Sequence, residues 1–262
     1  MMTNKVYTQA AFIALKSLVT KEITRYFRIW VQTLLPPAIT MSLYFVIFGK
    51  LIGERIGLME GVSYMEYITP GLIMMSVITN SYSNVASSFF SAKFQRNIEE
   101  LLVSPMPTLY ILIGFVLGGV TRGLLIGIIV TLVATQFVDL HINNYFVVFF
   151  VIILTSMMFA TAGLVNAIFA KSFDDISIVP TFILTPLTYL GGVFYSIKML
   201  PEFWQGVSMA NPVLYMVNAF RYGFLGFSDI PIENAISLIL VFIVSLFSLA
   251  YYLLDKGVGI RA

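Results

Sequence analysis

The side chains able to do chemistry are few in this chain of 262 residues. It has no cysteine, which excludes disulfides, thiolate metal sites and thiol nucleophiles. His141 is its single histidine, so a histidine-based zinc site within one chain and an H-E-x-x-H motif are excluded. The nucleotide-binding motif G-x-x-x-x-G-K-[ST] is also absent. We therefore predict no catalytic site, no metal site and no cofactor in this chain, and expect any energy source to be an ion gradient or another polypeptide.

Arg122 is the charged residue that lies well inside a long apolar stretch. Arginine stays protonated, so a lone arginine is a poor proton relay. Two interpretations remain open: Arg122 contacts a substrate or forms a polar hinge, or it snorkels or pairs with backbone carbonyls. Both place it inside the protein rather than against lipid. Other polar residues of these stretches could line a path for an amphiphile or form ordinary interhelical hydrogen bonds: Tyr44, Asn80, Tyr82, Asn84, Asn166 and Tyr189.

The elements that carry these residues are membrane helices. Charged residues make up 11% of the chain, against about 25% in typical soluble proteins. Six stretches lack charge and are each long enough to cross a bilayer, which takes roughly 20 apolar residues. We therefore predict an all-α membrane protein, with residues 1–262 forming one transmembrane domain. The predicted spans are residues 30–52, 67–90, 109–136, 145–170, 176–197 and 233–254.

The distribution of basic residues predicts that both termini are cytoplasmic. With six spans, ten basic residues fall on the side of the termini: Lys5, Lys16, Lys21, Arg25, Arg28, Lys93, Arg96, Lys171, Lys256 and Arg261. Four fall in the outer connections: Lys50, Arg55, Lys198 and Arg221. An excess of lysine and arginine marks the cytoplasmic side.

Residues 1–28 are predicted to contain an amphipathic helix at the membrane surface. Within residues 8–28, an apolar face recurs every three or four positions: Phe12, Leu15, Val19, Ile23 and Tyr26. Basic residues lie on another face: Lys21, Arg25 and Arg28. This combination suits the headgroup boundary. The alternative is a simple basic flank to the first span.

Glycines repeat every four residues in the third predicted span, at Gly119, Gly123 and Gly127, with a second pair at Gly114 and Gly118. Small residues at this spacing let two helix backbones approach closely. We predict tight helix packing along this ridge rather than a ligand site, and the ridge also offers a surface for a second subunit.

The connection after the second span is predicted to form a short amphipathic helix at about 92–103. Arg96 and Glu100 lie one helical turn apart and are expected to pair, and Pro105 and Pro107 end the helix. The helix has an apolar side: Phe94, Ile98, Leu101 and Leu102. It could dock in a groove of a partner, or it could be a connector that folds back on the membrane.

Residues 198–231 are predicted to form short re-entrant or interfacial helices on the outer side. The stretch from Phe203 to Phe220 is uncharged, but Gly206 and Pro212 interrupt it. A full span is therefore not expected there, and its aromatic residues suit the headgroup region.

The order of several short motifs resembles the permease subunits of ABC-2 type transporters, above all small bacterial inner-membrane permeases without their own ATPase domain. The resemblance covers nearly the whole chain. Its motifs are Arg96-Asn-Ile-Glu-Glu-Leu-Leu-Val-Ser-Pro105, Phe173-Asp174-Asp175, Leu190-Gly-Gly-Val-Phe-Tyr-Ser196, Leu200-Pro201, Asn211-Pro212, Tyr215 and Arg221.

The resemblance implies a multi-pass protein of the bacterial inner membrane that exports an amphiphilic, lipid-linked, drug-like or glycan substrate. It implies pairing with a second permease copy, in a homodimer, and with a cytoplasmic ABC ATPase that carries the ATP and Mg²⁺. Membrane lipid is expected around the chain, and nucleic acid is not an expected partner. The N-terminal helix and the helix at 92–103 would contact the ATPase through Arg96, Asn97, Glu99 and Glu100, with Asp174 and Asp175 close by. The segment 203–227 would form an outer gate that includes Asn211, Pro212, Tyr215 and Arg221.

An ion-coupled secondary transporter is the alternative. It would carry an inverted repeat and buried acidic residues. Residues 29–136 and 145–254 show no convincing repeat, and the expected acidic residues are missing from the predicted spans. An intramembrane enzyme is a third class, but Arg122 alone is not a catalytic cluster.

Overall fold

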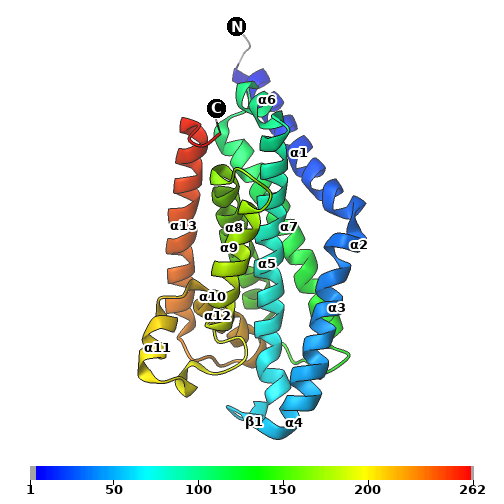
Figure 1. Ribbon diagram of the computed structural model, residues 1–262, viewed down its shortest axis with the longest axis vertical. Helices are drawn as coiled ribbons and strands as arrows, with labels where there is room; N and C mark the ends of the chain where they lie inside the picture. The colour runs from blue at the N-terminus through cyan, green and yellow to red at the C-terminus, as the bar shows by residue number, and fades with distance from the viewer. Residues whose placement is uncertain (1–3, 261–262) are drawn as a thin grey trace.

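The computed structural model describes residues 4–260, except the side chains of residues 4–8 and of Lys50. Lys5, Lys50 and Arg261, which entered the count of basic residues, therefore lie outside the described side chains. The described chain is an elongated helical bundle (Figure 1). Its one small sheet pairs β1 (Leu58–Met59) antiparallel with β2 (Val62–Ser63).

Among the described residues, five long helices are continuous, and the last four of them lie over predicted spans. They are α1 (Asn4–Arg28), α5 (Tyr64–Phe94), α7 (Thr108–Ala134), α8 (Tyr145–Phe169) and α13 (Ile232–Lys256). The region of the first predicted span is broken into α2 (Trp30–Thr33), α3 (Leu35–Tyr44), a π-helical segment (Phe45–Ile52) and α4 (Gly53–Ile56). A π-helix inside an α-helical run is a local irregularity in the hydrogen-bond ladder.

Four helical segments among the described residues are long and apolar enough to cross a membrane: Trp30–Ile56, Thr108–Ala134, Tyr145–Phe169 and Ile232–Lys256. The fifth predicted span is shorter than expected: α9 (Asp175–Val179), a π-helical turn (Pro180–Leu184) and α10 (Thr185–Tyr189), followed by non-helical residues. Gly192, at φ 70°, lies in the turn that ends it. The helical membrane architecture is confirmed, and the count of six spans stays a prediction.

Helix α5 is the centre of the bundle, packed against α7 and α8. It is 31 residues long and buries residues along its whole length, so it does not need the apolar surface of a lipid-facing helix. The chain enters it through a capping box, in which the Glu66 amide donates to Ser63 Oγ (3.2 Å) and the Ser63 amide donates to Glu66 Oε2 (2.8 Å). This cap satisfies helix N-terminal amides that have no intrahelical partner.

The remaining elements close the two ends of the bundle. At one end lies α6 (Asn97–Val103), beside the start of α1 and the end of α13 (Figure 1). At the other end are a 3₁₀ turn (Ile197–Met199), α11 (Glu202–Met209) and α12 (Pro212–Leu225). With 14 residues, α12 is too short to cross a bilayer. It is packed against α5, α8 and α13.

Large apolar side chains remain exposed along the bundle. On α13 they include Val241 and Val244, each 64% exposed, and on α8 they include Phe146, 74% exposed. Exposed apolar surface of this extent is unusual on a soluble monomer and is expected of helices that face lipid tails.

Candidate functional site

Helix α1 packs along α7, and its inward face overlaps the predicted apolar face only in part: Tyr26 is buried, and Leu15, Val19 and Ile23 are half-buried. Phe12, expected on that face, is 63% exposed, whereas Leu18 and Glu22 are buried. The reason is the pair of glycines on α7. A Cβ on Gly118 would lie 2.7 Å from Glu22 Cβ, and a Cβ on Gly114 would overlap the Leu18 side chain. The missing side chains let α1 approach closely and turn Leu18 and Glu22 inward.

A groove of about 620 Å³ separates α1 from α6 at the end of the bundle that carries both described chain ends. Its floor is partly apolar, with Leu18 buried and Leu101 half-buried, while Lys21 from α1 and Glu100 from α6 supply charge. Such a mixture of apolar floor and charged rim is suited to receiving a protein segment. The remaining residues that line the groove are Ala14, Ser17, Asn97, Ser104 and Met106.

The predicted pair of Arg96 and Glu100 is not formed. Among the described residues, neither side chain takes part in an ion pair. The single helix expected at 92–103 is broken: α5 runs on to Phe94, and Arg96 adopts a left-handed conformation at φ 62° before α6 begins. Without a continuous helix, the i,i+4 geometry is lost. Arg96, Asn97, Glu99 and Glu100 are all exposed, and Asn97 and Glu100 line the groove.

The loop 171–175 lies against the end of α5, because the ring of Phe173 packs edge-on against Phe90 at 4.9 Å between centroids. Asp174 is exposed and makes no capping hydrogen bond. Asp175 instead orders the loop: its Oδ2 accepts from the Lys171 amide (2.8 Å) and the Ser172 amide (3.0 Å). The hydrogen bonds from the Lys171 backbone and from Ser172 hold the pKa of the Asp175 carboxyl below its usual range.

A buried network of charged and amide side chains joins α1, α5 and α7. Glu22, 0% exposed, accepts from Ser88 Oγ at Oε1 (2.7 Å) and from Arg25 Nη2 at Oε2 (3.4 Å). The same Arg25 nitrogen donates to Oδ1 and to the backbone oxygen of Asn84, at 2.8 and 2.9 Å. The network thus ties α1 to the centre of α5.

Arg122 lies at the other end of this network, 9% exposed. Its Nη2 donates to Asn80 Oδ1 (2.9 Å) and to the Thr33 carbonyl (3.2 Å). Its Nη1 reaches Asn84 Oδ1 at 3.5 Å. The structure therefore places Arg122 inside the protein, with amide and carbonyl acceptors.

Most of this network was not predicted as a unit. Asn80 and Asn84 were recognised as polar, but Ser88 and the pairing of Glu22 with Arg25 were missed. The available signal was the spacing of Asn80, Asn84 and Ser88, which places three polar side chains on one face of α5. Glu22 was less accessible to sequence reasoning, because one acid among basic residues is typical of a solvated helix.

The predicted outer-gate residues form the contacts that hold α12 in place. Asn211 caps the helix, accepting from the Val213 amide (2.9 Å) and donating through Nδ2 to the Leu187 carbonyl (2.6 Å). Pro212 occupies the first turn, where its missing N–H costs nothing. The Tyr215 hydroxyl donates to the Met209 carbonyl (2.7 Å), which ties α11 to α12.

Arg221 is buried in this end of the bundle, 0% exposed. It donates to the Gly192 carbonyl (2.6 Å), lies 4.0 Å from the centre of the Tyr67 ring and has Asp229 Oδ2 at 4.0 Å. Asp229 accepts in addition from Ser196 Oγ (2.8 Å). Asp229 was not identified from the sequence, although its charge compensates that of Arg221.

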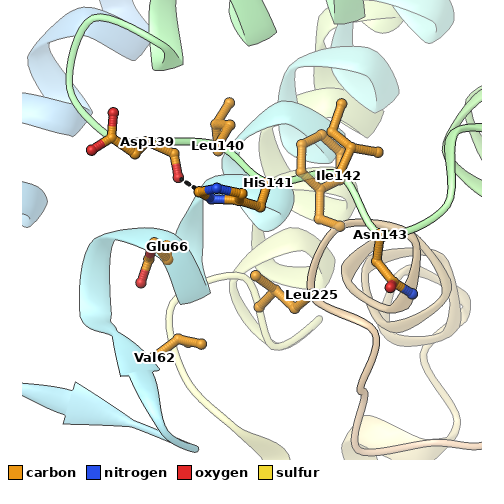
Figure 2. Close-up of a pocket in the computed structure, with 9 residues that line it drawn as sticks. Val62, Glu66, Asp139, Leu140, His141, Ile142, Asn143 and Leu225 are labelled. Carbon is orange, nitrogen blue, oxygen red and sulfur yellow. Dashed lines mark hydrogen bonds between the residues drawn. The ribbon is translucent and has the colours of Figure 1, made fainter.

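A further pocket of about 350 Å³ lies where the loop after α7 meets the start of α5 and the end of α12 (Figure 2). His141 and Glu66 both border it. His141 Nδ1 lies 3.3 Å from the backbone oxygen of Asp139, and Glu66 is held in its capping box. No group of three His, Cys, Asp or Glu residues within the described chain is arranged to hold a metal ion.

The ridge of Gly119, Gly123 and Gly127 faces α5 and α8 of the same chain. A Cβ on Gly119 would meet Ala160 Cβ at 2.6 Å, and a Cβ on Gly123 would overlap the hydroxyls of Ser81 and Ser156. This ridge is therefore covered within the chain, and a second subunit would have to use another face.

Gly123→Leu is expected to lower the stability of the detergent-solubilised protein by about 1–3 kcal/mol, the usual cost of overpacking. The matched control is Gly206→Leu on α11, where a Cβ would meet nothing within 4 Å. Thermal unfolding followed by size-exclusion chromatography measures both. Equal melting temperatures for the Gly123 variant and the parent would contradict the close packing of α7 with α5 and α8.

The fold and these sites define a multi-pass membrane protein whose buried charges are enclosed by long apolar helices. A family model for ABC-2 type transporters matches residues 13–225. The inner membrane transport permease YadH of Escherichia coli K12 is 59% identical over 251 residues, which cover 96% of this chain and 98% of YadH. Nodulation protein J of Rhizobium leguminosarum biovar viciae is 26% identical over 218 residues, 82% of this chain and 83% of that protein.

The chain belongs to the ABC-2 type transporter family, as its motifs predicted. It is a membrane transport permease, and a multi-pass protein of the inner membrane. Members of this family normally work with a cytoplasmic ATPase.

Proposed function

We propose that this permease is the transmembrane subunit of an ATP-driven exporter, paired with a second copy of itself and with an ABC ATPase that carries ATP and Mg²⁺. It moves an amphiphilic, lipid-linked, drug-like or glycan substrate from the cytoplasm or inner leaflet outward. The observation that carries the proposal is the groove between α1 and α6, at the end of the bundle that holds both described chain ends.

The groove is suited to an ATPase because it combines depth, charge and nearby exposed apolar residues. Beside Lys21 and Glu100, the exposed side chains at this end include Phe94 and Val103, 64% and 85% exposed. An apolar core with a charged rim is the usual composition of a protein interface. With this end facing the cytoplasm, Asp174 and the loop 171–175 lie beside the partner.

Coupling requires that the partner's ATP-bound form bind one state of the bundle better than the other. Helix α1 can transmit such a difference, because Leu18 lines the groove and Glu22, one turn further, enters the buried network. Movement of α1 at the groove would therefore change contacts with α5 and α7. The outer gate would be α11 and α12, which Arg221 holds against Gly192.

An ion-coupled secondary transporter is the alternative, and one observation bears on it. Glu22 is a buried acid, the type of residue such transporters use. Its two oxygens already accept hydrogen bonds from Ser88 and Arg25. This arrangement makes Glu22 a partner of Arg25 rather than an open ion site, and favours the exporter.

Glu100→Arg is expected to leave the permease folded and to abolish its association with the ATPase, because it reverses the charge on the groove wall. The tagged chain is purified from its native membrane in mild detergent, and co-purifying ATPase is quantified. The matched control is Glu233→Arg, an exposed glutamate in the first turn of α13, near the opposite end of the bundle.

The parent and the Glu233 variant should each co-purify with ATPase in about the same amount as the permease chain. ATP hydrolysis by that ATPase should be coupled to transport. Unchanged ATPase association in the Glu100 variant would refute the groove as the docking site. A chain that purifies alone and transports when an ion gradient is imposed would establish the secondary transporter instead.

A further inference from the structure

A pocket of about 320 Å³ lies between α3, α5 and α7, and Arg122 forms part of its wall. Asn80 and Thr33, the hydrogen-bond acceptors of Arg122, line it as well. Thr40 from α3 and Thr79 from α5 border the pocket and are exposed, so it opens at the surface of the bundle. Its volume is near the lower end of the range for small-molecule sites.

The charges around this pocket do not balance. Arg25 and Arg122 carry two positive charges, and Glu22 is the carboxylate of the network. Glu22 pairs with Arg25 at 3.4 Å. Within the described part of the chain, Arg122 forms no ion pair and is held by neutral oxygens. One buried positive charge is therefore left uncompensated.

Arg122 is also incompletely hydrogen-bonded. Its Nε has no partner among the described residues, although it is buried. A buried guanidinium without a counter-ion is costly, and arginine cannot relieve the cost by losing its proton. An anion in the pocket would supply both the missing charge and acceptors for the guanidinium, which binds phosphate and carboxylate groups well.

The surroundings of the pocket indicate that the anion carries apolar chains. On α3, the neighbours of Thr40 along the exposed face include Ile39 and Leu43, 52% and 57% exposed. A head group next to Arg122 would thus place its tails on an apolar surface of the bundle. A small free anion would use the charge but not this surface.

We propose that the pocket between α3, α5 and α7 binds the anionic head group of a membrane amphiphile, with Arg122 as its counter-ion. The head group is a phosphate or a carboxylate, and its acyl chains lie along α3. Binding requires no ATPase, so the proposal and the exporter function can fail independently.

The test is lipid binding to the delipidated, detergent-solubilised permease, followed by native mass spectrometry. The probes are dioleoylphosphatidylglycerol, dioleoylphosphatidylcholine and inorganic phosphate. The parent should bind the anionic lipid at least about tenfold more tightly than the zwitterionic one, since hydrogen bonds to charged groups are worth this much.

Arg122→Gln should remove this preference, and Thr40→Trp should remove it as well by filling the mouth of the pocket while keeping the charge. The matched controls are Arg55→Gln, an exposed arginine outside the pocket, and Val244→Trp, an exposed apolar residue of α13 that does not line it. Both should bind as the parent does.

If the Arg122 variant does not fold, the Thr40 variant still decides the matter. Equal binding of the two lipids by the parent, or an undiminished preference in the Thr40 variant, would overturn the site. Binding of inorganic phosphate as tight as that of the anionic lipid would overturn the amphiphile, because the tails would then contribute nothing.

Discussion

Replacing Arg221 with methionine is expected to cost about 3–5 kcal/mol of stability, the usual penalty for removing one partner of a buried ion pair. The guanidinium is 0% exposed and lies 4.0 Å from Asp229 Oδ2. Its loss would leave Asp229 with the exposed Lys198, 3.8 Å away, in place of a buried counter-charge, and the Gly192 carbonyl without its donor. The turn after α10 would then lose its connection to α12.

The double variant Arg221→Met with Asp229→Asn separates the charge from the packing. Replacing both partners of a buried pair by neutral groups is often far less costly than breaking it. We therefore expect the double variant to melt above the Arg221 single variant. Thermal unfolding in detergent measures both, with Arg55→Met as the exposed control. A single variant as stable as the parent would show that Arg221 does not hold this end of the bundle.

The burial of Arg221 also changes the count of basic residues that predicted the orientation. Arg221 was counted in an outer connection, but it lies in α12 with its charge inside the protein. The rule concerns basic residues in loops near the ends of spans. Without Arg221, the outer side loses one of its four basic residues, and the excess on the side of the termini becomes larger.

The long helices could be predicted because each depends on its own sequence. Residues 145–170 are uncharged and strongly apolar, and α8 runs from Tyr145 to Phe169. The fifth predicted span was equally uncharged, yet its helix ends at Tyr189. Hydropathy indicates that a segment lies in an apolar environment, but it does not indicate that the segment is helical. A buried turn, such as that of Gly191 and Gly192, also lies in an apolar environment.

Contacts between distant residues could not be predicted in the same way. The face of α1 that packs inward depends on Gly114 and Gly118, more than 90 residues further along the chain. The break at Arg96 was missed for a different, local reason: it depends on the backbone conformation of Arg96, which the helical pattern of 92–103 does not reveal. The glycine spacing did predict close packing, but not which helices approach.

The largest effect at the buried network is expected from Glu22→Gln. This change removes the carboxylate and leaves two positive charges joined through Asn84, the half-buried Arg25 and the buried Arg122. An uncompensated buried charge typically costs about 3–5 kcal/mol, so the variant should melt well below the parent. Glu99→Gln on the exposed surface of α6 is the matched control.

Two double variants then show which arginine Glu22 compensates. Its direct contact is with Arg25 at 3.4 Å, so Glu22→Gln combined with Arg25→Gln should recover more stability than Glu22→Gln combined with Arg122→Gln. Double-mutant comparisons isolate such pairwise couplings. Greater recovery with the Arg122 variant would mean that Glu22 balances the charge at the pocket, and that Arg122 has no need of an anion from outside the chain.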